Sequence, residues 1–214
     1  MSPRPYRLGR RKAAVEDTRA RILAGARAVL GEHGFAGFTI DAVADRAGVA
    51  RMTVYYQFDS KGALLDALLD ALAAGSLVDR LHASLGRAGP VTRIDPLDAL
   101  DEFIAAFVGF WASDRVVIRR LRSLAGLDPE VEGAVSARDA KRRAGLRVLV
   151  IQLIDTLGQP VDASIEDVTD LLHTLTSFET FDALAGRSRS PEDVAALLIR
   201  VAHAALGADA SVST

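Results

Sequence analysis

Apolar residues recur at helical spacing along nearly the whole chain, and this pattern limits the fold more than any other feature. Segment after segment carries apolar residues three and four positions apart, and no convincing stretch alternates apolar and polar residues as a half-buried strand would. Clusters of Gly, Pro and Ser fall where such segments stop. The chain is therefore predicted to be all-α.

Helix starts and stops divide the chain into segments. Four helices are expected before a Gly- and Pro-rich stretch at residues 86–96, and five after it. They cover about residues 14–33, 40–47, 50–57, 61–85, 97–112, 115–126, 129–157, 164–185 and 191–206. Residues 1–13 are expected to form a flexible basic arm, and residues 209–214 a tail.

Charge is distributed unevenly along the chain. Residues 1–62 hold 11 Lys and Arg against 6 Asp and Glu, whereas residues 63–214 hold 15 against 22. A basic head on an acidic body suggests that the head meets a polyanion. However, five of the basic residues lie within the first 12 positions, where an inert disordered tail would place them too.

Several classes of protein find no support in the sequence. Cysteine is absent, and the four histidines lack metal-ligand spacing, so we expect no disulfide, no metal site and no cofactor. No nucleophile with a base, no paired carboxylate motif and no phosphate loop is present, so we do not expect an enzyme. No signal peptide or membrane-length apolar run occurs, which favours a cytoplasmic protein without a membrane partner.

The most informative segment is residues 39–65, TIDAVADRAGVARMTVYYQFDSKGALL. Thr39 is a suitable N-cap for a short helix that ends at Gly48, and a second short helix follows after a tight turn. In that second helix, Ala50, Val54 and Phe58 recur at i, i+4 and i+8 and can face inward. The remaining surface then presents Arg51, Met52, Thr53, Tyr55 and Tyr56.

This outward face suits insertion into a DNA major groove, which admits one α-helix. Thr53 and the two tyrosine hydroxyls can donate to phosphate oxygens, and Arg51 can reach a guanine edge or a phosphate. Met52 can contact a thymine methyl, and Lys61 can place its ammonium on a phosphate near the positive end of the following helix. Alternatively, Tyr55 and Tyr56 pack between helices.

The segment resembles the signature of the tetracycline-repressor (TetR-like) family of bacterial regulators. The matching residues are Thr39, Ile40, Val43, Ala44, Ala47, Gly48, Val49, Thr53, Val54, Tyr55, Phe58, Ser60, Lys61 and Leu64. The resemblance implies a three-helix DNA-binding domain at residues 14–60, a connecting helix at 61–85 and a helical-bundle domain for ligand sensing and dimerisation at 86–208.

The resemblance also implies contacts with operator DNA by Thr39, Arg51, Thr53, Tyr55, Tyr56 and Lys61. We add Met52 and the arm residues Arg10, Arg11 and Lys12 as candidates from their chemistry. Two positions depart from the family pattern: Ala50 stands where a capping Ser or Thr is common, and Met52 stands where a smaller residue is usual.

A homodimer is expected, because two recognition helices related by a two-fold axis read a palindrome with half-sites about 34–36 Å apart or a multiple of that. Two apolar stripes on the last two predicted helices are candidates for the interface. They comprise Val168, Leu172, Leu175, Val194, Leu197, Leu198 and Val201. The alternative is an intramolecular core, and we favour a shared role.

Candidate ligand-binding residues in the larger domain are of two kinds. Phe103, Phe107 and Trp111 form an aromatic stripe that lines an apolar pocket or simply belongs to the core. Arg138, Arg142, Glu179 and His173 are polar groups on largely apolar helices, where ion pairs between helices are the competing explanation.

Together these features predict a DNA-binding regulator, most simply a repressor that a small molecule releases from its operator. A ligand-dependent activator of the same family is an alternative, and a helical-bundle enzyme is the competing class. The effector, the operator and the regulated genes cannot be read from the sequence.

Overall fold

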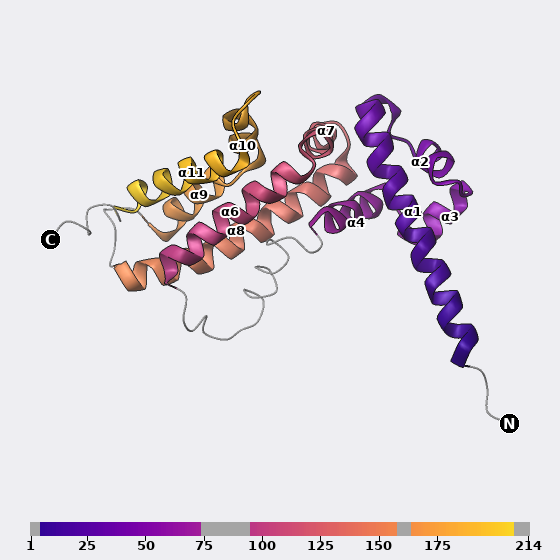
Figure 1. The fold of residues 1–214 in the computed structure, drawn as a ribbon, viewed down its shortest axis with the longest axis horizontal. Helices are drawn as coiled ribbons and strands as arrows, with labels where there is room; N and C mark the ends of the chain where they lie inside the picture. The colour runs from indigo at the N-terminus through magenta and orange to yellow at the C-terminus, as the bar shows by residue number, and fades with distance from the viewer. Residues whose placement is uncertain (1–4, 74–94, 158–163, 208–214) are drawn as a thin grey trace. The chain divides into compact units, whose positions relative to one another are not determined.

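The computed structural model describes residues 5–73, 95–157 and 164–207, and every regular element within these ranges is an α-helix, as predicted (Figure 1). The helices are α1 (Pro5–Gly37), α2 (Ile40–Ala47), α3 (Arg51–Phe58), α4 (Lys61–Ala73), α6 (Pro96–Ser113), α7 (Arg115–Ala125), α8 (Pro129–Leu157), α9 (Ile165–Leu175), α10 (Phe178–Ala185) and α11 (Pro191–Ala205). None of them is long and apolar enough to cross a membrane.

The chain forms two compact units. Unit 1 comprises Met1–Ala71 and Val116–Val135, and unit 2 comprises Leu72–Arg115 and Ser136–Thr214. The predicted domains are contiguous in sequence, whereas in these units α7 and the first turns of α8 associate with the N-terminal helices. The beginning of α8 therefore belongs to unit 1, and its residues from Ser136 onward belong to unit 2.

In unit 1, α1 packs along α2, and α2 packs against α3 (Figure 1). Gly25 allows the first of these contacts to be close, because a Cβ at this position would lie 3.2 Å from both the Ala47 nitrogen and the Val43 oxygen. On α7, Arg120 donates a hydrogen bond to the Leu30 main-chain oxygen over 2.9 Å, which ties α7 to α1. The core includes Ile22, Ala26, Leu30, Val43, Val54, Phe58, Leu64, Leu65 and Leu68.

Helix α1 is longer than the sequence indicated. Residues 5–13, expected to be a flexible arm, are helical, so this part of the prediction is corrected. Pro5 is compatible with a first helical turn, where its missing N–H leaves no bond unmade, and the Arg, Lys and Ala residues after it favour a helix. Gly34, the predicted stop, has a left-handed φ of 60° and marks a kink, beyond which the helix assignment continues to Gly37.

In unit 2, α11 packs against α6 and α9, and α10 contacts α6, α9 and α11. Ion pairs on the surface connect α8 to α9: Arg143 bonds to both Glu166 and Asp170, and Arg147 bonds to Glu166. Several apolar residues of α6 are buried, among them Leu100, Phe103, Ile104 and Phe107.

The predicted helix 164–185 is wrong, because the structure breaks it into α9 and α10 at Thr176 and Ser177. Ser177 has an extended backbone (φ −71°, ψ 156°), and its side chain accepts a hydrogen bond from the Thr180 nitrogen, as an N-cap does. The Thr176 hydroxyl donates back to the Leu172 oxygen at 2.9 Å. Such local side-chain bonds compete with helix continuation, and they override the apolar periodicity that runs through the segment.

Candidate functional site

The turn between α2 and α3 is defined by a cap at each end of α2. The Thr39 hydroxyl accepts a hydrogen bond from the Ala42 nitrogen at 3.1 Å, as predicted for an N-cap. Gly48 ends α2 in the left-handed conformation (φ 64°, ψ 41°), and its N–H bonds to the Ala44 and Asp45 oxygens. Helix α3 begins at Arg51. Val54 and Phe58 are buried, as their spacing predicts, whereas Ala50, which was expected to face inward with them, is exposed.

The outward face of α3 is accessible and carries little charge. Met52 is 72% exposed and Tyr56 is 86% exposed, although both are large side chains that proteins usually bury at least in part. Arg51 is exposed, and Thr53 and Tyr55 are half-buried on the same short helix. Ala50 provides no side-chain cap to α3, as its departure from the family pattern implied.

Arg51 is held in place by two neighbours rather than extending freely into solvent. Its guanidinium lies 3.0 Å from an oxygen of Asp41 on α2, and its Nη2 lies 3.5 Å from the Tyr55 hydroxyl. The hydrogen bond to Tyr55 and the charge of Asp41 raise the pKa of Arg51 further, so the group stays cationic. The Tyr55 side chain is half-buried, and its hydroxyl lies beside Arg51, so its predicted contact with DNA stays a prediction.

Two arginines of α1 hold the ends of α2 and α3, and the sequence analysis missed this role. Arg19 donates to the Gln57 oxygen at 3.1 Å and stacks 4.2 Å from the centre of the Phe58 ring. Arg21 donates to the Ala47 oxygen at 3.3 Å. Cations at helix C-termini are favourable because they meet unsatisfied carbonyl groups, so α1 fixes the position of α3 from behind.

Lys61, a predicted phosphate ligand, is engaged within unit 1. Its Nζ lies 2.7 Å from an oxygen of Asp128 and 5.7 Å from the centre of the buried Phe38 ring. Its side chain is 25% exposed. The hydrogen bond from Lys61 is the largest cause that lowers the pKa of Asp128 below its ordinary value, so the carboxylate remains ionised.

Of the three candidates expected on the arm, only Lys12 has a described side chain. It is exposed on α1 and lies 3.9 Å from Glu16. The side chains of Arg10 and Arg11 lie outside the described residues, so their assignment as DNA contacts stays a prediction.

The aromatic candidates of unit 2 form a continuous buried row. The Phe103 and Phe107 rings are 4.7 Å apart between centres, the Phe107 and Trp111 rings 6.0 Å, and the Trp111 and Phe178 rings 5.7 Å. The row runs along α6 and reaches α10 at Phe178. Trp111 donates its indole N–H to the Thr176 oxygen at 3.0 Å, which satisfies its one polar atom.

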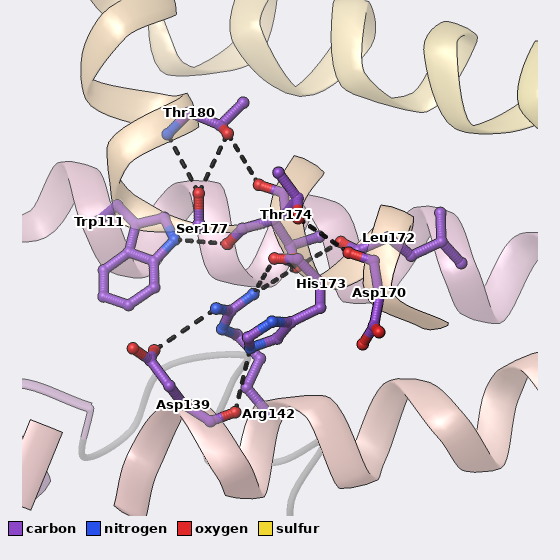
Figure 2. Close-up of polar contacts among 10 residues, drawn as sticks. Trp111, Asp139, Arg142, Asp170, Leu172, His173, Thr174, Ser177 and Thr180 are labelled. Carbon is purple, nitrogen blue, oxygen red and sulfur yellow. Dashed lines mark hydrogen bonds and ion pairs between the residues drawn. The ribbon is translucent and has the colours of Figure 1, made fainter. Parts of the chain in front are cut away.

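Arg142 lies where α8 meets the end of α9, as Figure 2 shows. Its Nη1 donates to the His173 oxygen at 2.6 Å and to the Thr176 hydroxyl at 2.7 Å, and its Nη2 lies 3.4 Å from Asp139. The residue is 2% exposed, and its guanidinium lies 5.8 Å from the centre of the Phe107 ring. A buried cation thus meets the negative end of α9 and one carboxylate.

His173 takes part in this cluster through its imidazole ring as well as its main-chain oxygen. Its Nε2 lies 3.1 Å from the Asp139 main-chain oxygen, and because a carbonyl only accepts, that nitrogen carries the proton (Figure 2). Burial is the largest cause that lowers the pKa of His173, and the charge of Arg142 adds to it. The structure therefore brings together Phe107, Trp111, Arg142 and His173, while Glu179 is exposed.

The seven residues expected at a dimer interface differ in exposure. Val168, Leu172, Val194 and Leu198 are buried within the single chain, which matches the alternative that they form an intramolecular core. Val201 is 41% exposed, and Leu175 and Leu197 are half-buried. Leu171, on the same helix as Leu172, is 43% exposed. Among the residues that the structure describes, no group of three or more His, Cys, Asp and Glu is suited to a metal ion.

Comparison with known proteins supports the N-terminal motif. Residues 22–68 match the family model "Bacterial regulatory proteins, tetR family". The chain is 32% identical to the HTH-type transcriptional regulator TtgR of Pseudomonas putida over 96 residues, which are 44% of this chain and 43% of TtgR. The alignment therefore spans less than half of that relative.

Two further comparisons extend over most of the chain. The HTH-type transcriptional regulator EthR of Mycolicibacterium smegmatis is 27% identical over 90% of this chain and 88% of its own length. The crystal structure of a TetR transcription regulator from Haloarcula marismortui superposes with a TM-score of 0.65 at 25% identity, covering 90% of this chain and 98% of that structure. The N-terminal segment of the chain therefore matches the tetR family of bacterial regulatory proteins, and the fold of the chain is similar to that of a TetR transcription regulator.

Proposed function

We propose that this protein is a dimeric, sequence-specific DNA-binding repressor that a small molecule releases from its operator. The observation that carries the proposal is the outward face of α3, where Met52 and Tyr56 are 72% and 86% exposed. A short helix with exposed apolar, hydroxyl and guanidinium groups has the size and chemistry to read base edges in a major groove.

Thr53, Tyr55 and Arg51 complete the surface of α3 that is proposed to contact DNA. Tyr55 and Thr53 present hydroxyls that can donate to phosphate oxygens, and Thr39 lies exposed at the start of α2. Arg51, held by Asp41 and Tyr55, is restrained in orientation before DNA arrives, so less side-chain freedom is lost on binding. These four residues offer contacts to the DNA backbone around the apolar centre formed by Met52 and Tyr56.

The dimer is proposed to form through α9 and α11. Their candidate contact residues are the accessible ones, Leu171, Leu175, Leu197 and Val201, whereas the buried members of the same stripes stabilise the protomer. One α3 helix covers only a few base pairs, so a pair related by a two-fold axis is needed to read a palindrome.

The effector is proposed to bind in unit 2 near the aromatic row and the Arg142 cluster. A buried guanidinium beside aromatic rings offers an anionic or aromatic ligand both charge and apolar contact. Ligand binding releases DNA only to the extent that the ligand favours the non-binding conformation, and DNA weakens ligand binding by the same factor.

The DNA-binding part is tested by selection from a library of randomised duplexes, followed by fluorescence anisotropy with the enriched duplex. Met52→Ala and Tyr56→Ala are expected to weaken binding roughly tenfold each. Val148→Ala, a change at an exposed apolar residue of α8, is the control and should leave affinity unchanged. Failure of the parent protein to enrich any sequence would contradict the proposal.

The dimer is tested by light scattering, which should give twice the chain mass. Val201→Asp should shift the protein towards the monomer and weaken operator binding, because it places a charge in the apolar contact. Val148→Asp, with a nearly equal exposure of 44% against 41%, is the matched control. A parent protein that remains monomeric would exclude this model.

The ligand part is tested by screening small carboxylates and aromatic compounds in thermal-shift measurements. A compound that stabilises the parent protein should also reduce operator affinity. Reporter expression distinguishes repression from activation: loss of the gene should raise expression for a repressor and lower it for an activator.

A further inference from the structure

Two acidic residues at the start of α8 contact the first turn of α4. The Asp128 carboxylate accepts from Lys61 Nζ at 2.7 Å, and the Glu130 carboxylate accepts from the Gly62 main-chain nitrogen at 3.0 Å. All four residues belong to unit 1. An ammonium and a main-chain N–H at a helix start are donors of the kind that bind a phosphate group.

The fit between the two helices is close at one point. A Cβ on Gly62 would lie 3.2 Å from both the Cβ and the main-chain oxygen of Glu130, so this contact depends on the absence of a side chain at position 62. Gly62 is buried, and the Lys61 and Asp128 side chains are only 25% and 23% exposed. The two carboxylates therefore engage the donors of α4, Asp128 from a largely buried position and Glu130 from an exposed one.

The contact lies next to the proposed reading surface. Helix α3 ends at Phe58 and α4 begins at Lys61, so only Asp59 and Ser60 separate them. A duplex that received α3 in its groove would bring its phosphate backbone towards the start of α4, and the phosphate would need the donors that Asp128 and Glu130 occupy. Phosphate and carboxylates cannot share one ammonium and one N–H without strong like-charge repulsion.

We propose that Asp128 and Glu130 form an autoinhibitory contact that competes with the DNA backbone for Lys61 and the Gly62 N–H. This inference rests on the proposed DNA-binding function. Helix α8 also carries Arg142, so the segment that holds the two carboxylates continues into the unit proposed to bind the effector. Strengthening or releasing the contact would then adjust operator affinity without any change at α3.

The test uses Asp128→Asn and Glu130→Gln, measured by anisotropy with the duplex that the parent protein enriches. Asparagine can retain the cap that Asp128 provides to the Glu130 nitrogen, so α8 should still start at its native position. Each variant is expected to bind DNA roughly three- to tenfold more tightly, because a competing charge is removed. For Asp128→Asn, the plot of log affinity against log salt should steepen by about 0.9, since Lys61 gains one phosphate.

Two controls separate competition from a general charge effect. Glu132→Gln changes the charge equally at an exposed residue of the same helical turn, and should alter affinity less than about twofold. In a Lys61→Met background, Asp128→Asn should no longer increase affinity, because the shared donor is gone.

Stability distinguishes this proposal from a purely structural role. Both variants lose a contact, so their unfolding midpoints should fall while their DNA affinity rises. Unchanged or weaker DNA binding in Asp128→Asn and Glu130→Gln, with the parent protein binding normally, would overturn the inference and leave the proposed function intact. If the parent protein enriches no duplex, the proposed function and this inference both fail, because there is then no DNA backbone for the two carboxylates to compete with.

Discussion

The indole nitrogen of Trp111 donates to the Thr176 main-chain oxygen at 3.0 Å, and so connects α6 to the break between α9 and α10. The Thr176 hydroxyl in turn accepts a hydrogen bond from Arg142 at 2.7 Å. Thr176 is 2% exposed, so neither bond is readily replaced by water. The junction therefore depends on one donor from α6 and one from α8.

Trp111→Phe should remove the first donor and keep most of the ring. Leaving the buried Thr176 oxygen without this donor costs about 1–3 kcal/mol in the free energy of unfolding. Urea unfolding followed by circular dichroism measures the change, since the variant lacks the chain's only tryptophan. An unchanged free energy would mean that another group takes over as donor.

Arg142→Met should destabilise the protein by about 3 kcal/mol, because it deprives the His173 oxygen and the Thr176 hydroxyl of a buried charged donor. Arg142→Lys keeps the charge but not the planar guanidinium, so its free energy of unfolding should lie between those of Arg142→Met and the parent protein. Arg143→Met is the control, because its ion pairs to Glu166 and Asp170 lie on the surface and should matter much less. Equal losses for Arg142→Met and Arg143→Met would contradict this view of the cluster.

His173 should make the protein less stable in mild acid. Its folded pKa is lowered by burial and by the Arg142 charge, so the unfolded chain takes up a proton first as the pH falls below the ordinary histidine value of about 6.5. Stability is therefore lost as the pH drops from there through the folded pKa. His173→Gln should flatten this dependence in urea unfolding measured at a series of pH values, and identical pH profiles for the two proteins would contradict the prediction.

Gly25→Ala should destabilise unit 1, because the new Cβ would lie 3.2 Å from two main-chain atoms of α2, which cannot move independently. We expect a loss of about 1–3 kcal/mol, as for overpacking of a close helix contact. Gly133→Ala is the matched control in the same unit: its Cβ meets nothing within 4 Å, so the change should stabilise α8 by roughly 0.5–1 kcal/mol. Thermal unfolding of both variants should give shifts of opposite sign.

Arg19→Ala should weaken operator binding although Arg19 lies on α1. The change removes the donor to Gln57 and the stacking on Phe58, and so loosens the end of α3. A stability loss of about 0.5–1 kcal/mol is expected from the lost cation–π contact. Anisotropy with the selected duplex would measure the affinity. If the variant Arg19→Lys binds DNA more tightly than Arg19→Ala, this would support a positioning role for Arg19 over a specific base contact.

Local signals in the sequence predicted the helix-turn-helix correctly. Thr39 and Gly48 are residues whose chemistry determines a cap, and the spacing of Val54 and Phe58 indicates which side of α3 faces the core, although Ala50 is exposed. The predicted ends of α6, α7, α8 and α11 also agree with the structure to within a residue, and Pro or Gly stands near most of these boundaries, although not at the one between α6 and α7.

Contacts between distant residues could not be predicted in this way. Nothing local indicates that Lys61 pairs with Asp128, 67 positions away, or that Arg142 meets the His173 oxygen. Apolar periodicity also failed where α9 ends, because it continues through Thr176 and Ser177 while their side chains cap and break the helix. Buried and accessible members of one stripe, such as Leu198 and Val201, become distinguishable only when neighbouring helices are in place.

Trp111, the only tryptophan of the chain, lies on α6 and bonds to the α9–α10 junction, so its fluorescence can report on that junction. Indole emission responds to the polarity around the ring and to nearby charge, and Trp111 is 6% exposed beside aromatic neighbours. An effector that rearranges the junction would shift the emission spectrum of the unlabelled protein, which permits stopped-flow measurement of ligand arrival without altering a single residue.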